Sequence, residues 1–289
     1  MGVSIGEAKE LATRGQTKDN IKQSNNTDDI LHELKVEDLK ELNLSSSSRG
    51  NQRKWMDTQS GQYVKEQFYY QNKYWDDWKV EILATKISKS MNTTVQVLEQ
   101  LPVKLDCGTF AVVSKDFCKN DESFVSFNRI LKKYGLDFNE KLFPLVKFDF
   151  VRDTVQLACS IDITEYLIVM ILLDYILLNE DRHLNNFGVI WGNGKYREAP
   201  LFDFGLGLFE HDKKYENKTY DSAVARINGK PFCEDMFSII YALSRSAYKD
   251  ILKRVVPKVT YEDLEMYTPN ELSRVHLKAA LMNLKGLNL

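Results

Sequence analysis

The chain has 289 residues and a formal net charge of −2, and hydrophobic residues make up 43% of it. This apolar content excludes a disordered chain, and the length allows one large domain or two lobes with separate cores. The near balance of 39 basic and 41 acidic residues argues against a dedicated nucleic-acid binder, which is expected to carry a basic stripe.

The first 44 residues are polar and contain no aromatic residue. No apolar stretch follows Met1, so we expect no secretory signal and a cytoplasmic protein. The four cysteines form no C-x-x-C motif and are expected to be reduced thiols. Towards the end of this part, apolar residues recur at helical spacing, so we predict an extension over 1–44 that is partly flexible and carries a short helix. The apolar positions are Ile30, Leu31, Leu34, Leu39 and Leu42.

Residues 45–118 are predicted to form a small β-rich lobe. Stretches rich in β-branched and aromatic residues, such as GQYVKEQFYY and TFAVVSKDF, are typical of strands. Between them, WDDWKVEILATKISKSM has the pattern of a helix. The predicted order is strand, strand, helix, strand, strand.

Residues 119–289 are predicted to form a helical lobe. One amphipathic helix should end at Gly135, and a nearly all-apolar central helix should begin at Asp162 and Glu165, which have capping-box spacing. The apolar run Tyr166 to Leu178 is too short to span a bilayer and contains Asp174, so we expect no membrane association. The fold class is therefore α+β, with two lobes and a cleft between them.

The stretch NEDRHLNNFGVIWGNGKYREAPLFDFG, from Asn179 to Gly205, contains the most informative spacing. Its Asn193-Gly194 pair predicts a tight turn between two strands. That hairpin would bring the loop from Asp181 to Asn186 and the later Asp203 to the same end. A D-F-G motif alone is equally compatible with a turn at the end of a strand, but its combination with the hairpin favours a functional site.

Phosphoryl transfer requires a group of this kind. One carboxylate orients the nucleophile or accepts its proton, while a second carboxylate and an amide oxygen hold Mg²⁺ on the phosphates. Asp181, followed after four residues by Asn186 and later by D-F-G at Asp203, has the protein-kinase spacing. A loop histidine such as His183 is more often a hydrogen-bonded scaffold than a catalyst, although His183 could contact a nucleotide phosphate. Glu180 is expected to be a solvated loop charge.

The first lobe offers candidates for the remaining parts of a kinase cleft. Lys65 lies within a predicted strand and would reach phosphates if it faced the cleft; the alternative is an exposed edge-strand lysine. Glu81 lies in the following helix and would pair with this lysine; the alternative is a solvated glutamate. The segment SSSSRGNQRKW, which begins at Ser45, could cradle phosphate with its backbone N–H groups or could be a flexible linker.

Together these motifs resemble the HipA-like serine/threonine kinases from Ser45 to about Gly207. The family's phosphate loop S-x-x-G-x-Q-x-K is matched by Ser47, Gly50, Gln52 and Lys54. Its catalytic loop N-x-D-x-H-x-x-N is matched by Asn179, Asp181, His183 and Asn186. The resemblance implies a two-lobed protein-kinase-like fold and the use of ATP and Mg²⁺.

The resemblance also implies a role for individual residues. Asp181 would be the catalytic base, and Asn186 and Asp203 would bind Mg²⁺. The residues implied in ATP binding are Lys65, paired with Glu81, together with Gly50, Gln52, His183 and the hinge Ser114, Lys115, Asp116 and Phe117. Ser47 would be the autophosphorylated serine that switches the kinase off, with Ser45, Ser46 and Ser48 as neighbouring candidates.

Two departures from the family keep alternatives open. Full-length members have an N-terminal subdomain of about 100 residues, which the ~44 residues here cannot form, so we expect a short form completed by a separately encoded partner. The D-R-H-x-x-N and D-F-G motifs also resemble phosphatidylinositol kinases. A lipid or small-molecule kinase and a nucleotide-binding pseudokinase are therefore the alternatives. Family members phosphorylate proteins, and some are toxins restrained by an antitoxin, but no motif here identifies the substrate.

Overall fold

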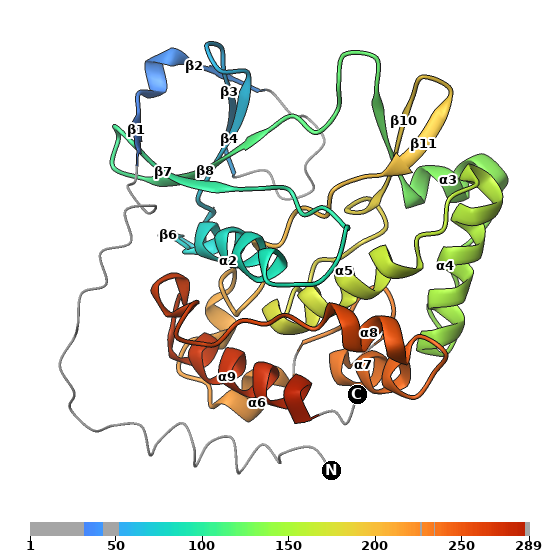
Figure 1. Cartoon of the computed structure of the whole chain (residues 1–289). Helices are drawn as coiled ribbons and strands as arrows, with labels where there is room; N and C mark the ends of the chain where they lie inside the picture. Colours follow the sequence, from blue (N-terminus) through green and yellow to red (C-terminus); the bar gives the residue numbers. More distant parts are fainter. Residues whose placement is uncertain (1–31, 43–51, 226, 234, 287–289) are drawn as a thin grey trace.

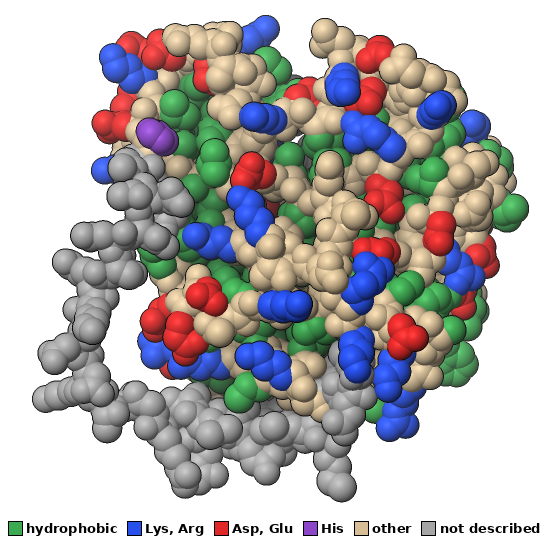
Figure 2. Space-filling model, viewed as in Figure 1, with side chains coloured by type: hydrophobic (Ala, Val, Ile, Leu, Met, Phe, Trp, Pro, Cys, Tyr) green, Lys and Arg blue, Asp and Glu red, His purple; other side chains and the backbone are tan. Residues whose placement is uncertain are grey.

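The computed structural model describes residues 32–42, 52–225, 227–233 and 235–286. A β-rich part lies above a mainly helical part, and helix α2 (Asp77–Lys89) lies between the larger sheet and the helices below it (Figure 1). Basic and acidic side chains are intermixed over the face shown in Figure 2.

The larger sheet has six strands in the order β1-β7-β8-β4-β3-β2. β1 is parallel to β7, and every other neighbouring pair in this sheet is antiparallel. Alternate residues of the strands face a small apolar cluster that includes Trp55, Val64 and Leu105. The strands are β1 (His32–Leu34), β2 (Leu39–Glu41), β3 (Lys54–Asp57), β4 (Gln62–Glu66), β7 (Leu101–Leu105) and β8 (Phe110–Lys115).

The short helix predicted within 1–44 is wrong for the residues described there. His32–Leu34 and Leu39–Glu41 are strands, joined by the short 3-10 turn η1 (Val36–Asp38). Leu34 and Leu39 still pack against the sheet cluster, but they do so from strands. Pairing with β7 and β3 satisfies the backbone, whereas an isolated helix of this length would be marginal. The sheet therefore begins before the predicted boundary at residue 45.

The predicted order of strands and helix in the first lobe is confirmed, with one addition. A two-stranded hairpin of β5 (Tyr69–Tyr70) and β6 (Lys73–Tyr74) stands between β4 and α2. Helix α2 then buries Val80, Leu83 and Ile87 in the main core. This helix packs against both the sheet and the central helix below it.

The hairpin predicted around Asn193 and Gly194 in the second lobe is confirmed. β10 (Gly188–Gly192) pairs with β11 (Lys195–Glu198), and the turn residues Asn193 and Gly194 have φ angles of 52° and 72°, as a tight primed turn requires. A third strand, β9 (Ser123–Ser126), pairs with the other edge of β10. Helix α3 (Phe127–Tyr134) follows directly and ends at Gly135 in a left-handed conformation, as predicted. It begins later than the helical pattern over 121–135 predicted, because Ser123–Ser126 is strand β9.

The central helix α5 (Thr164–Leu177) is buried almost all round and packs against α2, α7, α8 and α9. Its capping box is not formed as predicted. Asp162 accepts the N–H of Thr164 at 2.8 Å, while Glu165 forms an ion pair with Arg254 at 2.6 Å. The other helical elements are α4 (Pro144–Cys159), η2 (Lys213–Tyr215), α6 (Tyr220–Val224), α7 (Met236–Ser244), α8 (Lys249–Val255), η3 (Glu265–Tyr267) and α9 (Glu271–Gly286).

Two further expectations concern the chain as a whole. The cysteines are free thiols, as predicted: Cys107 is exposed, Cys118 is half-buried, and Cys159 and Cys233 are buried. Within the described residues, no helix is both long enough and apolar enough to cross a lipid bilayer.

Candidate active site

Polar side chains of the motif stretch meet residues of the first lobe where the two parts face each other. Lys65 extends from β4, and Glu81 from α2. Asp203 follows β11, and Asn186 lies two residues before β10. The contacts described below join these four residues into one continuous chain.

Lys65 is the centre of this chain. Its Nζ lies 2.8 Å from Oε1 of Glu81 and 3.0 Å from Oδ1 of Asp203. Burial alone would lower the pKa of Lys65, but the nearby carboxylates outweigh it and raise that pKa, so the ammonium stays charged. β4 has a partner strand on both sides and Glu81 is 1% exposed, so the alternatives of an edge lysine and a solvated glutamate are wrong.

Glu81 also holds the D-F-G turn in place. Its Oε2 accepts the backbone N–H of Phe204 at 3.1 Å. A Cβ on the next residue, Gly205, would lie 3.2 Å from Glu81 and 3.3 Å from the buried carboxylate of Asp77. The glycine therefore lets the turn approach two carboxylates on α2 closely.

Asp203 is strained, charged and accessible. Its φ of 63° is unusual for a residue with a side chain, and both carboxylate oxygens are held, one by Lys65 and the other by Nδ2 of Asn186 at 3.0 Å. The charge of Lys65 lowers the pKa of Asp203 to about 2. This low pKa keeps the carboxylate ionised. The side chain is also 42% exposed, so it is open to a ligand.

Asp181 and His183 lie on the loop between α5 and β10. The loop is fixed by its own contacts: Asn179 Oδ1 accepts the N–H of Asp181 at 3.2 Å, and Asn186 Nδ2 donates to the Asp181 carbonyl at 3.3 Å. Nδ1 of His183 accepts the N–H of Asn185 at 3.2 Å, which is the scaffold role given as the first alternative. The roles of Asp181 as base and of His183 as a nucleotide contact stay predictions.

Glu180 is not a solvated loop charge, contrary to expectation. Its side chain is 13% exposed and accepts hydrogen bonds from His211 and Tyr215, each at 2.5 Å. No local pattern indicated these contacts, because both partners lie about thirty residues further along the chain.

A buried ion pair behind the loop was also missed. Arg182 is fully buried and forms a two-pronged pair with Asp174 of α5, with two N···O distances of 2.9 Å. Its third nitrogen donates to the carbonyls of Asn186 and Phe202, and its guanidinium lies 4.6 Å from the ring centre of Phe204. Asp174, an acidic residue within an otherwise apolar helix, was the sequence feature that could have indicated this ion pair. The pair ties α5, the loop and the D-F-G turn together.

The predicted hinge lines a cavity of about 320 Å³, within the range of small-ligand pockets. Lys65, Glu81 and Asp203 lie on its wall, as do all four hinge residues predicted from the resemblance. Lys54, which pairs in register with Lys65, is a further cation on this wall. The remaining lining residues are Leu42, Tyr63, Val64, Leu98, Gln100 and Phe202.

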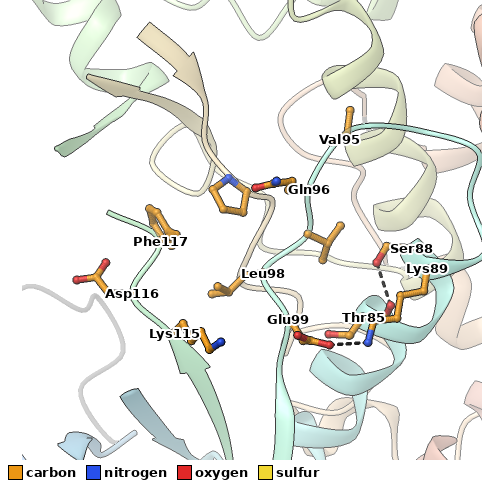
Figure 3. A pocket seen from close by; sticks show the side chains of 12 residues that line it. Thr85, Ser88, Lys89, Val95, Gln96, Leu98, Glu99, Lys115, Asp116 and Phe117 are labelled. Carbon is orange, nitrogen blue, oxygen red and sulfur yellow. Dashed lines mark hydrogen bonds and ion pairs between the residues drawn. The ribbon is translucent and has the colours of Figure 1, made fainter. Parts of the chain in front are cut away.

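A second hollow, of about 380 Å³, also borders the predicted hinge (Figure 3). It is bounded by the end of α2, the segment 95–99 and Pro200, and it shares Leu98, Lys115, Asp116 and Phe117 with the first cavity. The charges drawn there include the exposed pair Lys89–Glu99, at 2.5 Å. Lys65 and Asp203 line only the first cavity, which is therefore the candidate nucleotide pocket.

The predicted phosphate loop is described only in part. Gly50 and the serines Ser45 to Ser48 lie outside the described residues. Gln52 is described, and its amide nitrogen donates to the Glu66 carbonyl at 2.7 Å and to Asp77 Oδ2 at 2.9 Å. The side chain thus anchors the start of β3 to α2, and a contact of Gln52 with ATP stays a prediction.

The site contains a donor set that fits Mg²⁺. Within the described ranges, no group of three or more histidine, cysteine, aspartate or glutamate side chains converges on one point. Asp203 and Asn186 instead offer one ionised carboxylate and one amide in contact with each other. Mg²⁺ is commonly held by one or two carboxylates, with waters and substrate phosphates completing the shell, so this small set suits a cation that binds with a nucleotide.

Comparisons with known proteins show the fold. The Helicobacter pylori proinflammatory kinase CtkA matches with a TM-score of 0.60 and 20% identity, over 89% of this chain and 94% of that one. HipA of Shewanella oneidensis, solved with HipB and operator DNA, matches with a TM-score of 0.38 and 12% identity, over 94% of this chain and 70% of that one; at this score we rest no argument on it. No protein-family model and no curated protein matches the sequence.

The predicted two-lobed, protein-kinase-like fold is confirmed by the match to CtkA. The resemblance to HipA-like kinases, first noted on the motifs, agrees with this fold. At 20% identity the match concerns the fold, and the chemistry of this chain has to be argued from its own residues.

Proposed function

We propose that this chain is an ATP- and Mg²⁺-dependent serine/threonine protein kinase of the HipA-like type. The observation that carries the proposal is the continuous chain of contacts from Glu81 through Lys65 and Asp203 to Asn186, on the wall of a ligand-sized cavity. A cation held by a buried carboxylate and facing an accessible carboxylate is the arrangement with which protein kinases hold nucleotide phosphates and Mg²⁺.

The residues have distinct tasks in this proposal. Lys65 binds the phosphates of ATP, and Glu81 holds its ammonium in place. The backbone of Ser114 to Phe117 binds the adenine. Asp203 and Asn186 hold Mg²⁺, which neutralises charge that develops on the phosphates. Asp181 orients the acceptor hydroxyl and takes its proton.

The acceptor and the partner come from the resemblance. A serine or threonine of a protein is the proposed acceptor, and a serine of the run Ser45 to Ser48 is the proposed site of autophosphorylation. A separately encoded antitoxin or regulatory partner is proposed for the same reason. The HipA structure contains HipB and operator DNA, and this supports nothing more specific for the present chain.

Intact-mass spectrometry of the purified chain, before and after incubation with Mg-ATP, tests the proposal. We expect a gain of phosphate in the wild type and none in Asp181→Asn. Asp137→Asn, a matched change at an exposed residue, should behave as the wild type.

Three results would contradict the proposal. ATP binding without transfer to any protein substrate would indicate a pseudokinase. Label on an inositol lipid rather than on protein would indicate a lipid kinase. Full phosphorylation in Asp181→Asn would remove the role of Asp181.

A further inference from the structure

The segment that follows D-F-G is attached directly to the loop that carries Asp181. The side chain of Glu180, the residue before Asp181, is 13% exposed, and its carboxylate contacts this segment. His211 Nε2 and the Tyr215 hydroxyl both bind its Oε2 at 2.5 Å, and Lys214 lies 3.7 Å from its Oε1. All three partners lie within five residues of each other on the segment.

The charge state of Glu180 suits this arrangement. Burial would raise the pKa of Glu180, but the hydrogen bond and charge of His211, with help from Tyr215 and Lys214, lower it. The carboxylate is therefore ionised and accepts strong hydrogen bonds. The backbone N–H of Glu180 also donates to the carbonyl of Leu206 at 3.4 Å, so the loop and the start of the segment are joined twice.

The same segment is also held by the first lobe and by Asn270, which directly precedes α9. Glu210 accepts the N–H of Asp76, just before α2, at 3.0 Å, and Asn270 donates to its second oxygen. The side chain of Gln71, in the turn between β5 and β6, bonds to Asp212 at 3.3 Å and to the N–H of Lys213 at 2.9 Å. Residues 206–216 are thus held on one side by these contacts and on the other by Glu180, so weakening the Glu180 contacts loosens the side that faces the Asp181 loop.

We propose that Glu180 is a positioning residue: by binding His211 and Tyr215 it holds the segment 206–216 and the Asp181 loop as one ordered unit. The inference rests on the proposed function, because the consequence for transfer runs through Asp181. His211 supports a functional reason for this geometry. Its Nδ1 is buried and, among the described residues, has no hydrogen-bond partner, a cost that is unusual in a purely structural contact.

The test compares the wild type with Glu180→Gln, which keeps the shape but loses the charge. Backbone hydrogen–deuterium exchange is measured by mass spectrometry over 179–187 and 206–216. Phosphate transfer from Mg-ATP and the Kd for Mg-ATP are measured on the same samples. We expect exchange to rise at least threefold in both segments and transfer to fall at least tenfold, while the Kd for Mg-ATP changes less than twofold.

Two further variants keep the outcome clear. Tyr215→Phe removes a single hydroxyl and should give the same pattern at smaller size, which decides the matter if Glu180→Gln does not fold. Glu99→Gln, at an exposed glutamate paired with Lys89, is the matched control and should leave all three readouts unchanged.

The inference is overturned if folded Glu180→Gln shows wild-type exchange in either segment. It is also overturned if exchange rises but transfer does not change, because the contact would then stabilise the fold without affecting transfer. A wild type that transfers no phosphate contradicts the proposed function instead, and the exchange of the two segments then decides whether Glu180 joins them.

Discussion

Two groups of charged side chains meet at the D-F-G turn, and they differ in what they leave open. In the first, Lys65 links Glu81 to Asp203, and the carboxylate of Asp203 remains 42% exposed. In the second, Arg182 and Asp174 are 0% and 8% exposed, and the nitrogens of Arg182 bond to protein oxygens. The first group keeps an ionised oxygen for a ligand, whereas the second is closed.

This difference separates side chains that are expected to act on a ligand from side chains that are expected to stabilise the fold. A charge that is exposed within a cleft costs little desolvation and can be shared with an incoming cation or phosphate. A buried pair is closed to such ligands, and removing one partner leaves the other as an uncompensated buried charge. We therefore expect changes in the open group to affect transfer and changes in the closed group to affect stability.

The largest expected effect is that of Asp203→Asn on transfer. Removing the charge leaves Mg²⁺ without its carboxylate, and we expect the initial rate with Mg-ATP to fall about ten-thousandfold, or about 5 kcal/mol in the barrier. The free energy of unfolding should change by less than about 1 kcal/mol, because this side chain is partly exposed.

Initial rates and urea unfolding of the same preparations measure both quantities, with Asp137→Asn as the control. A rate within tenfold of the wild type would mean that Asp203 does not hold the metal. A large loss of stability would place Asp203 in the closed group instead.

The opposite pattern is expected for Arg182→Met. Methionine can keep the contact with the Phe204 ring, but Asp174 becomes a buried charge with Asn179 as its remaining side-chain donor. We expect the free energy of unfolding to fall by about 4 kcal/mol. Urea unfolding monitored by tryptophan fluorescence measures this loss, and a change below about 1 kcal/mol would show that the pair is not structurally important.

The double variant Asp174→Leu with Arg182→Met separates the two causes of this loss. It leaves no buried charge and should regain part of the stability. It should not regain all of it, because the carbonyls of Asn186 and Phe202 still lack their donor. A double variant as unstable as the single one would mean that these carbonyl contacts dominate.

The sequence predicted the open group far better than the closed one. Asp181, Asn186 and Asp203 have a fixed spacing around a hairpin, which a single sequence displays. The sequence left Lys65 and Glu81 open between the cleft and solvent, and their mutual contact decided it. Arg182 and Asp174 lie on separate elements, and no spacing rule connects them.

Contacts between residues that are far apart in the sequence also explain the other predictions that were wrong. Residues 32–41 have helical spacing, but strands β7 and β3 gave them better backbone partners. Glu180 was expected to be solvated because its partners His211 and Tyr215 are far along the chain. A single sequence contains little information about such pairings, since tertiary contacts override local propensity.

The smallest expected effect concerns His276, a buried polar side chain that carries no charge in the folded chain at neutral pH. His276 is fully buried between Tyr220, at 3.1 Å from its Nδ1, and the carbonyl of Tyr175, at 3.2 Å from its Nε2. Burial lowers the pKa of His276 to about 4, from an ordinary value of 6.5. As pH falls below 6.5, the unfolded chain takes up the proton first, so this residue makes folding less favourable down to pH 4.

From pH 7.5 to pH 5 this uptake should cost the wild type about 2 kcal/mol of unfolding free energy. The carboxyl groups of Asp77 and Glu198, whose pKa values burial raises to about 7, act in the opposite direction, since the folded state binds their protons first. The measured quantity is therefore the difference between the wild type and His276→Gln in urea at the two pH values. His276→Gln should lose about 2 kcal/mol less than the wild type, and equal losses would show that His276 is protonated as readily in the folded chain as in the unfolded one.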